Sequence, residues 1–180
     1  MGAGEGGGRS GQPHKRIKFP TRGARIMNRM LRLALVLILV SPGLVLGQGD
    51  GALVFGRCVP CHQGDGFGKA GLYPPLMTNA PELVKGSRTY LITVLLYGLE
   101  GKIAIKGQKV VYSGLMPSQY SLKDEEIAAV LNYILTSWGN DKLLPKDFRH
   151  ITADEVKAER GKNLMPRQVY EIRKELRLAE

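Results

Sequence analysis

Five consecutive residues, Cys58-Val59-Pro60-Cys61-His62, carry the clearest chemical signal in the sequence. Cys58 and Cys61 are the only cysteines of the 180-residue chain, they stand three positions apart, and His62 follows directly. Positions i, i+3 and i+4 of a helix lie on one face, so both thiols and the imidazole would point the same way. That arrangement suits two thioether bonds to haem vinyl groups and an axial nitrogen on the haem iron, which is the chemistry that Cys-x-x-Cys-His indicates.

Three other uses of this motif fit the sequence less well. A structural zinc site needs four protein ligands, but there is no second cysteine pair, and the only other histidines are His14 and His150. A thioredoxin-like redox pair would lie near a βαβ pattern, and no such alternation follows. A disulfide would constrain a single helical turn and leave His62 unexplained. We therefore predict one haem c (heme c), attached covalently at Cys58 and Cys61.

Met116 is the predicted second axial ligand of the haem iron. It lies between a glycine and a proline in Gly114-Leu115-Met116-Pro117, just upstream of a predicted helix. A thioether opposite a histidine stabilises reduced iron and raises the reduction potential. Met165-Pro166 is a second Met-Pro pair, but it lies at a predicted helix start in the tail. A methionine is usually flexible core filler. We favour Met116 as the ligand because it lies in a loop. Without this ligand, the open iron position would accept a peroxide or a gas, as in an enzyme or a sensor.

Pro74 is the predicted partner of the His62 imidazole. A glycine-rich loop over residues 63–69 leads into Tyr73-Pro74-Pro75-Leu76. A metal-bound histidine normally donates its other N–H to a carbonyl or a carboxylate, which fixes the orientation of the ring. We predict that the carbonyl of Pro74 accepts this hydrogen bond. The loop is not predicted to bind phosphate, because no strand precedes it and no lysine–serine pair closes it.

Short helices are the elements that must position these groups. The pattern predicts a first helix over 50–62 and two helices over 81–98 that are broken at Gly86. The second of these is apolar on most faces, as expected of a helix against a buried cofactor. A small hairpin is predicted over 103–112. A helix over 121–137 is predicted to begin with a capping box from Ser121. The fold class is therefore all-α.

The charge of the chain is concentrated near its beginning. Lys and Arg number 26 and Asp and Glu 16, giving a net charge of +10. Residues 1–47 hold eight of the basic side chains and one of the acidic ones, which leaves +3 for the rest. A nucleic-acid-binding protein needs a basic face on its folded part, so no nucleic-acid partner is predicted. The length allows one domain.

The first 47 residues are predicted to serve targeting. Residues 1–26 read as a disordered basic leader or as a start codon assigned too early, with a basic binding arm as the alternative. Residues 27–47 have the charged start, short apolar run and small residues near Gly47 of a cleaved signal peptide. The apolar run is too short to span a membrane, although an uncleaved anchor is the alternative. The following domain is thus predicted to be periplasmic or otherwise exported.

The order of these motifs resembles that of the class I cytochromes c. The likeness rests on Cys58-x-x-Cys61-His62, then Pro74-x-Leu76, then Met116, then a closing helix. It implies a class I cytochrome c fold, with short helices around one haem over residues 48–140. It also implies His62 and Met116 as axial ligands and the Pro74 carbonyl on the His62 imidazole. One departure from the general family is the spacing of two residues, instead of three, between Phe55 and Cys58.

That spacing matches a narrower group, the soluble periplasmic cytochromes c of Thermus-type thermophiles, which residues 50–178 resemble. The likeness implies an electron-transfer protein and not an enzyme: a monomer that carries single electrons in a respiratory chain. A quinol–cytochrome c reductase or similar donor would supply them, and a terminal oxidase would accept them. Contact with membranes would be through partners or an uncleaved anchor. The alternative is a cytochrome subunit or electron-input domain of a periplasmic dehydrogenase complex.

Residues 141–180 are predicted to form a C-terminal helical extension. Two short amphipathic helices are expected here, one of them opening with a capping box of Thr152 and Glu155. Helices of this length are not stable alone, so they must dock on something. We predict a clamp packed on the haem domain, with a partner-binding arm as the alternative.

Overall fold

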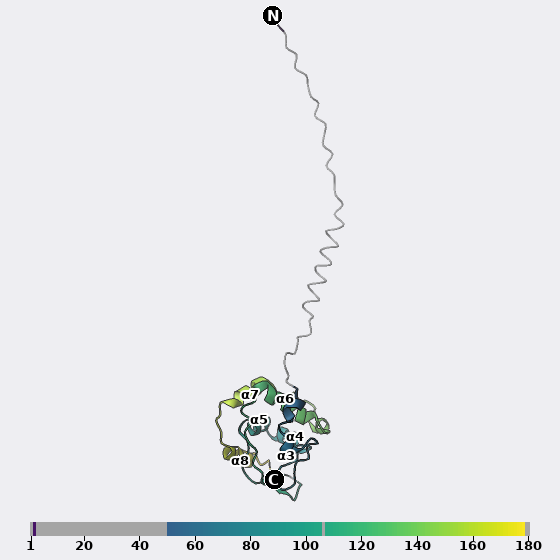
Figure 1. Cartoon of the computed structure of the whole chain (residues 1–180), viewed down its shortest axis with the longest axis vertical. Coiled ribbons are helices and arrows are strands. Elements are labelled where there is room, and N and C mark those ends of the chain that lie inside the picture. The colour runs from purple at the N-terminus through teal and green to yellow at the C-terminus, as the bar shows by residue number, and fades with distance from the viewer. Residues whose placement is uncertain (1, 3–49, 106, 179–180) are drawn as a thin grey trace. The chain divides into compact units, whose positions relative to one another are not determined.

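The structure is a computed structural model, and it describes residues 2, 50–105 and 107–178 (Figure 1). Every helix that the structure describes belongs to the unit Val45–Glu180. Apart from Gly2, the predicted leader over 1–26 and signal peptide over 27–47 lie outside the described residues, so both remain predictions. Within the described part, none of the helices has the length and apolar character needed to cross a membrane.

The start of the folded unit is two short helices, α2 (Gly51–Phe55) and α3 (Val59–His62). The prediction of one continuous helix over 50–62 is therefore wrong. Pro60 explains the interruption, because proline has no N–H to donate and is tolerated in the first turn of a helix. It occupies the first turn of α3, and the chain reaches α3 through tight turns after Phe55.

The middle of the unit is formed by α4 (Asn79–Gly86) and α5 (Arg88–Tyr97). Ser87 separates them in an extended conformation, and its side chain accepts a hydrogen bond of 3.1 Å from the Tyr90 N–H. Gly98 ends α5 at φ +78°, and the predicted break at Gly86 is confirmed. Eight of the ten residues of α5 are buried, and it contacts α4, α6, α7 and α8. It is the central helix of the core.

The two strands of the described residues form the predicted hairpin. β1 (Ile103–Ala104) pairs antiparallel with β2 (Val111–Tyr112), with Ile103 opposite Tyr112. A 3₁₀ helix, η1 (Asn140–Leu143), follows the long helix described next. Helices make up nearly all of the regular structure in this part of the chain, which confirms the all-α fold class.

The longest helix of the described part, α6 (Asp124–Thr136), crosses the start of the folded unit. It begins after Lys123, whose backbone N–H donates to Glu126 Oε2 at 2.8 Å, so the predicted capping box from Ser121 is wrong. The crossing with α2 is close, because a Cβ built on Gly51 would overlap the carbonyl oxygen of Ala129. Only glycine permits this approach.

Two helices of the tail, α7 (Ala153–Arg160) and α8 (Pro166–Glu175), pack on the central helices. In the view of Figure 1 they lie on either side of α5. Val156 and Val169 are fully buried in the same core as α5 and α6. The predicted capping box at the start of α7 is present, with Thr152 N donating to Glu155 Oε2 at 2.7 Å.

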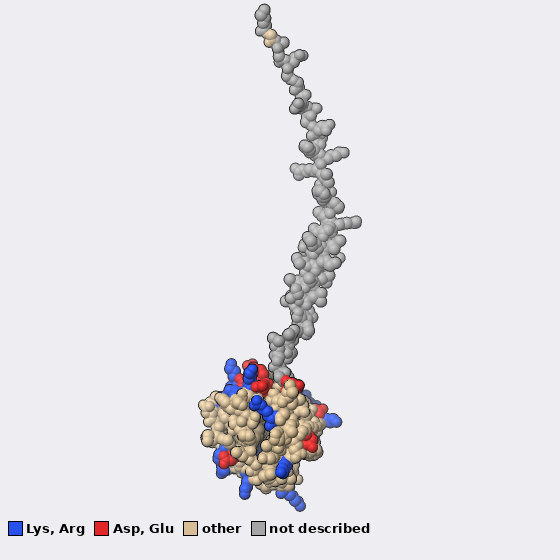
Figure 2. Space-filling model, viewed as in Figure 1, with Lys and Arg blue, Asp and Glu red and all other residues tan. Residues whose placement is uncertain are grey.

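Charged side chains of both signs lie on the face of this unit shown in Figure 2. The view matches the nearly balanced charge of residues 48–180, because Lys and Arg side chains do not gather into a single basic area there. No charged surface therefore dominates the face in view.

Candidate functional site

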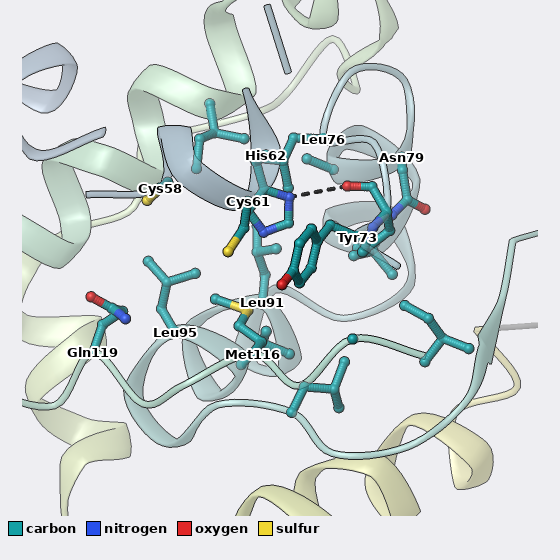
Figure 3. A pocket seen from close by; sticks show the side chains of 18 of the residues that line it. Cys58, Cys61, His62, Tyr73, Leu76, Asn79, Leu91, Leu95, Met116 and Gln119 are labelled. Carbon is teal, nitrogen blue, oxygen red and sulfur yellow. Dashed lines mark hydrogen bonds between the residues drawn. The ribbon is translucent and has the colours of Figure 1, made fainter. Parts of the chain in front are cut away.

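One cavity brings together most of the residues that the sequence singles out. Cys58, Cys61, His62, Pro74 and Met116 all line it (Figure 3). It encloses about 1140 Å³ when its opening to solvent is included. This volume is slightly above the range of about 300–1000 Å³ for small-molecule and cofactor sites, because it includes space that is open to solvent. The structure thus assembles groups from three separate stretches of the chain at one place.

The turn of α3 presents the two thiols and the imidazole. His62 N donates to the carbonyl of Cys58 at 2.8 Å, which closes one helical turn around the motif. Cys58 and Cys61 are not joined in a disulfide, and both are partly buried. Burial raises the pKa of the Cys58 thiol, with a further rise from Cys61 and a partial offset from Arg57.

The imidazole of His62 is fixed in its orientation by Pro74. His62 Nδ1 lies 3.0 Å from the carbonyl oxygen of Pro74, and 8% of the residue is exposed. Burial lowers the pKa of His62, and the contact with the Pro74 carbonyl opposes this in part. A neutral imidazole is the form that binds metals. Figure 3 shows the other ring nitrogen facing the cavity, on the side of Met116.

The glycine-rich loop holds the Pro74 carbonyl in place. Lys69 and Tyr73 exchange two backbone hydrogen bonds of 2.8 Å. Gly68 has a φ of +68°, and a Cβ built on it would stand 2.6 Å from the oxygen of Pro74. The loop therefore requires glycine at this position to bring the carbonyl to His62.

Met116 reaches the same cavity from the opposite wall. Its backbone pairs with Leu99 through hydrogen bonds of 3.0 and 2.9 Å, which ties the methionine loop to the end of α5. The Met116 side chain is partly buried and lines the cavity. Met165 differs, because it is 66% exposed at the start of α8 and does not line the cavity. Of these two methionines, only Met116 lies with His62.

The walls of the cavity are almost entirely apolar. α5 contributes four of the lining residues, more than any other helix of the described part, which agrees with its apolar character on nearly every face. Apolar side chains that line the cavity include Leu76, Ala80, Leu83, Leu91, Val94, Leu95, Leu131 and Ile134. An apolar ring system would be well accommodated between them.

Two polar residues on the wall were not predicted from the sequence. Tyr90 is 1% exposed and Arg173 is 2% exposed, and both line the cavity. Neither Tyr90 Oη nor Arg173 Nε has a hydrogen-bond partner among the described residues. One sequence signal marks Arg173: it stands four positions after Val169, on the apolar side of an otherwise polar amphipathic helix. A mostly apolar cofactor with acidic substituents would fit these walls and these two groups.

A helical protein whose apolar cavity holds two thiols, a carbonyl-bonded imidazole and a thioether has the site of a c-type haem protein. The chain belongs to the cytochrome c family, whose model, described as Cytochrome c, matches residues 49–138. Membership implies a covalent haem c and an electron-transfer protein that is not an enzyme. It also confirms the predicted class I cytochrome c fold.

Four relatives show how much of the chain is shared. One cytochrome c-552 of Thermus thermophilus is 49% identical over 150 residues, covering 82% of this chain and 99% of the relative. A second Thermus thermophilus cytochrome c-552 is 51% identical over 133 residues, covering 73% of this chain and 99% of the relative. The cytochrome c subunit of a quinone alcohol dehydrogenase from Gluconacetobacter polyoxogenes is 34% identical over 53% of this chain and 21% of its own length. A fructose dehydrogenase cytochrome subunit from Gluconobacter japonicus is 31% identical over 62% of this chain and 22% of its own length. The predicted resemblance to Thermus cytochromes is thus confirmed.

Proposed function

We propose that this chain is a freestanding carrier of single electrons that delivers them to a terminal oxidase. A quinol–cytochrome c reductase or a similar donor would supply the electrons. The proposal is supported by the extent and level of the match, which includes 99% of each cytochrome c-552 relative at about 50% identity, but only about a fifth of each dehydrogenase subunit at 31–34% identity. We further propose that it acts as a monomer after export, with residues 27–47 as the signal peptide.

One observation carries the assignment of the site, namely that a single cavity is lined by both thiols, the imidazole and the Met116 thioether. Cys58 and Cys61 would hold the haem by thioether bonds, and His62 and Met116 would be its axial ligands. When bound, the haem supplies the one-electron change of its iron. Pro74 would keep the imidazole ring from rotating. The apolar walls would exclude water, so little solvent would have to reorient when the charge changes.

Replacement of the axial methionine tests this assignment. We expect Met116→Ala to abolish the near-red absorption band of methionine-ligated ferric haem and to let the reduced protein bind carbon monoxide. Met165→Ala is the matched control, and it should leave the band and the poor carbon monoxide binding unchanged, because Met165 lies outside the cavity. Loss of the band in the Met165 variant alone would overturn the assignment.

A second candidate function is that of a cytochrome subunit in a periplasmic dehydrogenase complex. The likeness to alcohol and fructose dehydrogenase subunits favours it. The two functions differ in the behaviour of the native protein. A freestanding carrier should be purified as a soluble monomer and be oxidised rapidly by a terminal oxidase. Purification only as part of a dehydrogenase complex, with no oxidation by the oxidase, would favour the second function.

A further inference from the structure

Arg160, the last residue of α7, contacts the segment that joins Met116 to α6. Its Nη1 atom donates to the carbonyl of Tyr120 and its Nη2 atom to the carbonyl of Leu122, each at 2.7 Å. Within the described residues, neither carbonyl receives another hydrogen bond from the backbone. The Nε atom donates to Oδ1 of Asp124, the first residue of α6, at 2.7 Å. One guanidinium thus uses all three of its nitrogens on this segment.

The aromatic ring of Tyr120 covers the same guanidinium. Arg160 Cζ lies 4.7 Å from the centre of the Tyr120 ring, within the range of a cation–π contact. The side chains of Arg160 and Asp124 are each 22% exposed, so this charge is largely shielded from water. A planar fork that bonds three oxygens and also stacks on a ring is specific to arginine, and a lysine cannot reproduce it.

The backbone of Arg160 is itself fixed to the end of α5 by Tyr97. The Tyr97 hydroxyl lies 2.7 Å from the carbonyl oxygen of Arg160 and 2.8 Å from that of Glu159, and the two share its one proton. The same hydroxyl accepts from the Lys162 N–H at 3.1 Å. Tyr97 is 5% exposed and is the last residue of α5. Arg160 therefore joins the segment to a buried helix end.

The segment bonded to Arg160 continues directly into the wall of the cavity. Met116 and Gln119 both line the cavity (Figure 3). Gln119 is bonded to α5, since its N–H donates to the carbonyl of Leu95 at 2.9 Å. The next residue, Tyr120, is bonded to Arg160. The loop is therefore held by α5 on one side and by the tail on the other.

We propose that Arg160 is a positioning residue for the axial methionine, and that it keeps residues 117–123 closed so that Met116 stays on the haem iron. The inference rests on the proposed function, because it requires Met116 as an axial ligand. Groups that hold a metal ligand in place commonly change metal affinity or activity by about 10- to 100-fold when they are removed. The tail would thus protect the iron from competing ligands, a role beyond that of a clamp or a partner-binding arm.

Imidazole binding to the ferric, haem-loaded protein measures this role. Imidazole binds the iron only while Met116 is away from it, so the apparent affinity reports how much of the loop is open. Loss of the near-red band follows the binding. We expect Arg160→Met to raise the apparent affinity by about 10- to 100-fold. Arg160→Lys keeps the positive charge and loses the planar fork, so it should give a smaller increase.

Arg88→Met is the matched control for a general loosening of the tail. Arg88 forms an ion pair with Glu155 of α7, donates to the carbonyl of His150 and lies over the ring of Phe148. None of its hydrogen bonds in the described part of the chain reaches residues 116–124. Both Arg88→Met and Arg160→Met should lower the free energy of unfolding, but only Arg160→Met should change imidazole binding.

Hydrogen exchange of the ferric proteins gives a second readout that needs no added ligand. The N–H groups of Gln119 and Leu122 are both hydrogen-bonded within or beside the loop. Opening of the loop exposes them to exchange without unfolding of the whole domain. They should exchange faster in Arg160→Met than in Arg88→Met or in the wild-type protein.

Two results would overturn the inference and leave the proposed function intact. One is an unchanged imidazole affinity and unchanged exchange in Arg160→Met. The other is an equal increase in Arg88→Met, because the effect would then come from the tail as a whole. If Arg160→Met does not fold, Arg160→Lys and Tyr120→Leu, which removes the ring over the guanidinium, are compared with Arg88→Met in the same way. A haem-loaded wild-type protein without the near-red band would instead overturn the proposed axial ligand.

Discussion

Asn132, a buried side chain of α6, forms two hydrogen bonds to the segment just before α7. Its Nδ2 donates to the carbonyl of Ile151, and its Oδ1 accepts from the Ile151 N–H, both at 2.8 Å. Asn132 is 7% exposed and Ile151 is 2% exposed, so water cannot readily replace these hydrogen bonds. Asn132→Ala would leave two buried backbone groups of Ile151 without partners.

The size of the effect follows from these two groups. An unsatisfied buried donor or acceptor costs about 1–3 kcal/mol, so Asn132→Ala should lower the free energy of unfolding by about 2–6 kcal/mol. This is a large share of a typical stability of about 5–15 kcal/mol. The assay is guanidinium-induced unfolding of the ferric protein, together with hydrogen exchange of residues 151–160, which should become faster.

Thr136→Ala is the matched control for this experiment. Thr136 is exposed one turn further along α6, and its hydroxyl donates to a backbone carbonyl of its own helix. A change within about 0.5 kcal/mol is expected there, as for most surface substitutions. If Asn132→Ala also stayed within that range, or if the exchange of residues 151–160 did not change, the reasoning that this pair fastens the tail would be refuted.

Two further predictions concern the methionine loop and the ion pair between α5 and α7. Gly98→Ala should weaken the near-red band, because its Cβ would overlap the Met116 carbonyl oxygen. Gly107→Ala is the control, because Gly107 has a similar φ of +77° but open space around it. It should lower the free energy of unfolding by only about 1–2 kcal/mol, the strain of a left-handed residue, and leave the band unchanged. Equal spectral changes in the two variants would contradict the role of Gly98. Arg88 bonds to Glu155 at 2.5 Å and holds the pKa of that carboxyl below its ordinary value of 4.5. The pair should therefore stabilise the fold above about pH 4.5 and lose this effect as the pH falls through the lower folded-state pKa. Denaturant midpoints measured from about pH 7 to about pH 3 should fall less steeply for Glu155→Gln, and parallel curves would contradict the linkage.

Local patterns were sufficient to predict most of the helices. The apolar stretch between Gly86 and Gly98 predicts α5, because a break before it and a left-handed glycine after it are both visible in the sequence. Thr152 and Glu155 predict the start of α7, since both partners of the capping box lie within four residues. Such features depend on neighbours along the chain and not on the rest of the fold.

Two boundaries were predicted wrongly, one because tertiary packing overrides a local signal and the other because two local signals conflict. Ser121 has the sequence of a helix cap, but Leu122 is buried at 5% exposure, and the chain must first turn to place it in the core. α6 therefore begins only after Lys123, where Glu126 reaches back to the backbone. Residues 50–62 form two helices and not one, because Pro60 has no N–H to continue the helical hydrogen bonds, although the apolar pattern favours a single helix.

The residues of the site also differ in whether the sequence alone identifies them. The spacing of Cys58, Cys61 and His62 is local, and so it is readable from the sequence. Arg173 lies more than a hundred positions from this motif, and its presence on the cavity wall depends on how the tail docks. No local pattern reports that docking, although the arginine on the apolar side of α8 hints at a buried role.

The most direct test of the account is the intact mass of the exported native protein after denaturation and thiol alkylation. The account predicts a chain that begins near residue 48, carries the mass of one haem and takes up no alkylating reagent, because Cys58 and Cys61 are both in thioether bonds. An alkaline pyridine spectrum of the same sample should be that of a haem with both vinyl groups saturated. A chain without the added mass and with both cysteines alkylated would contradict the central claim.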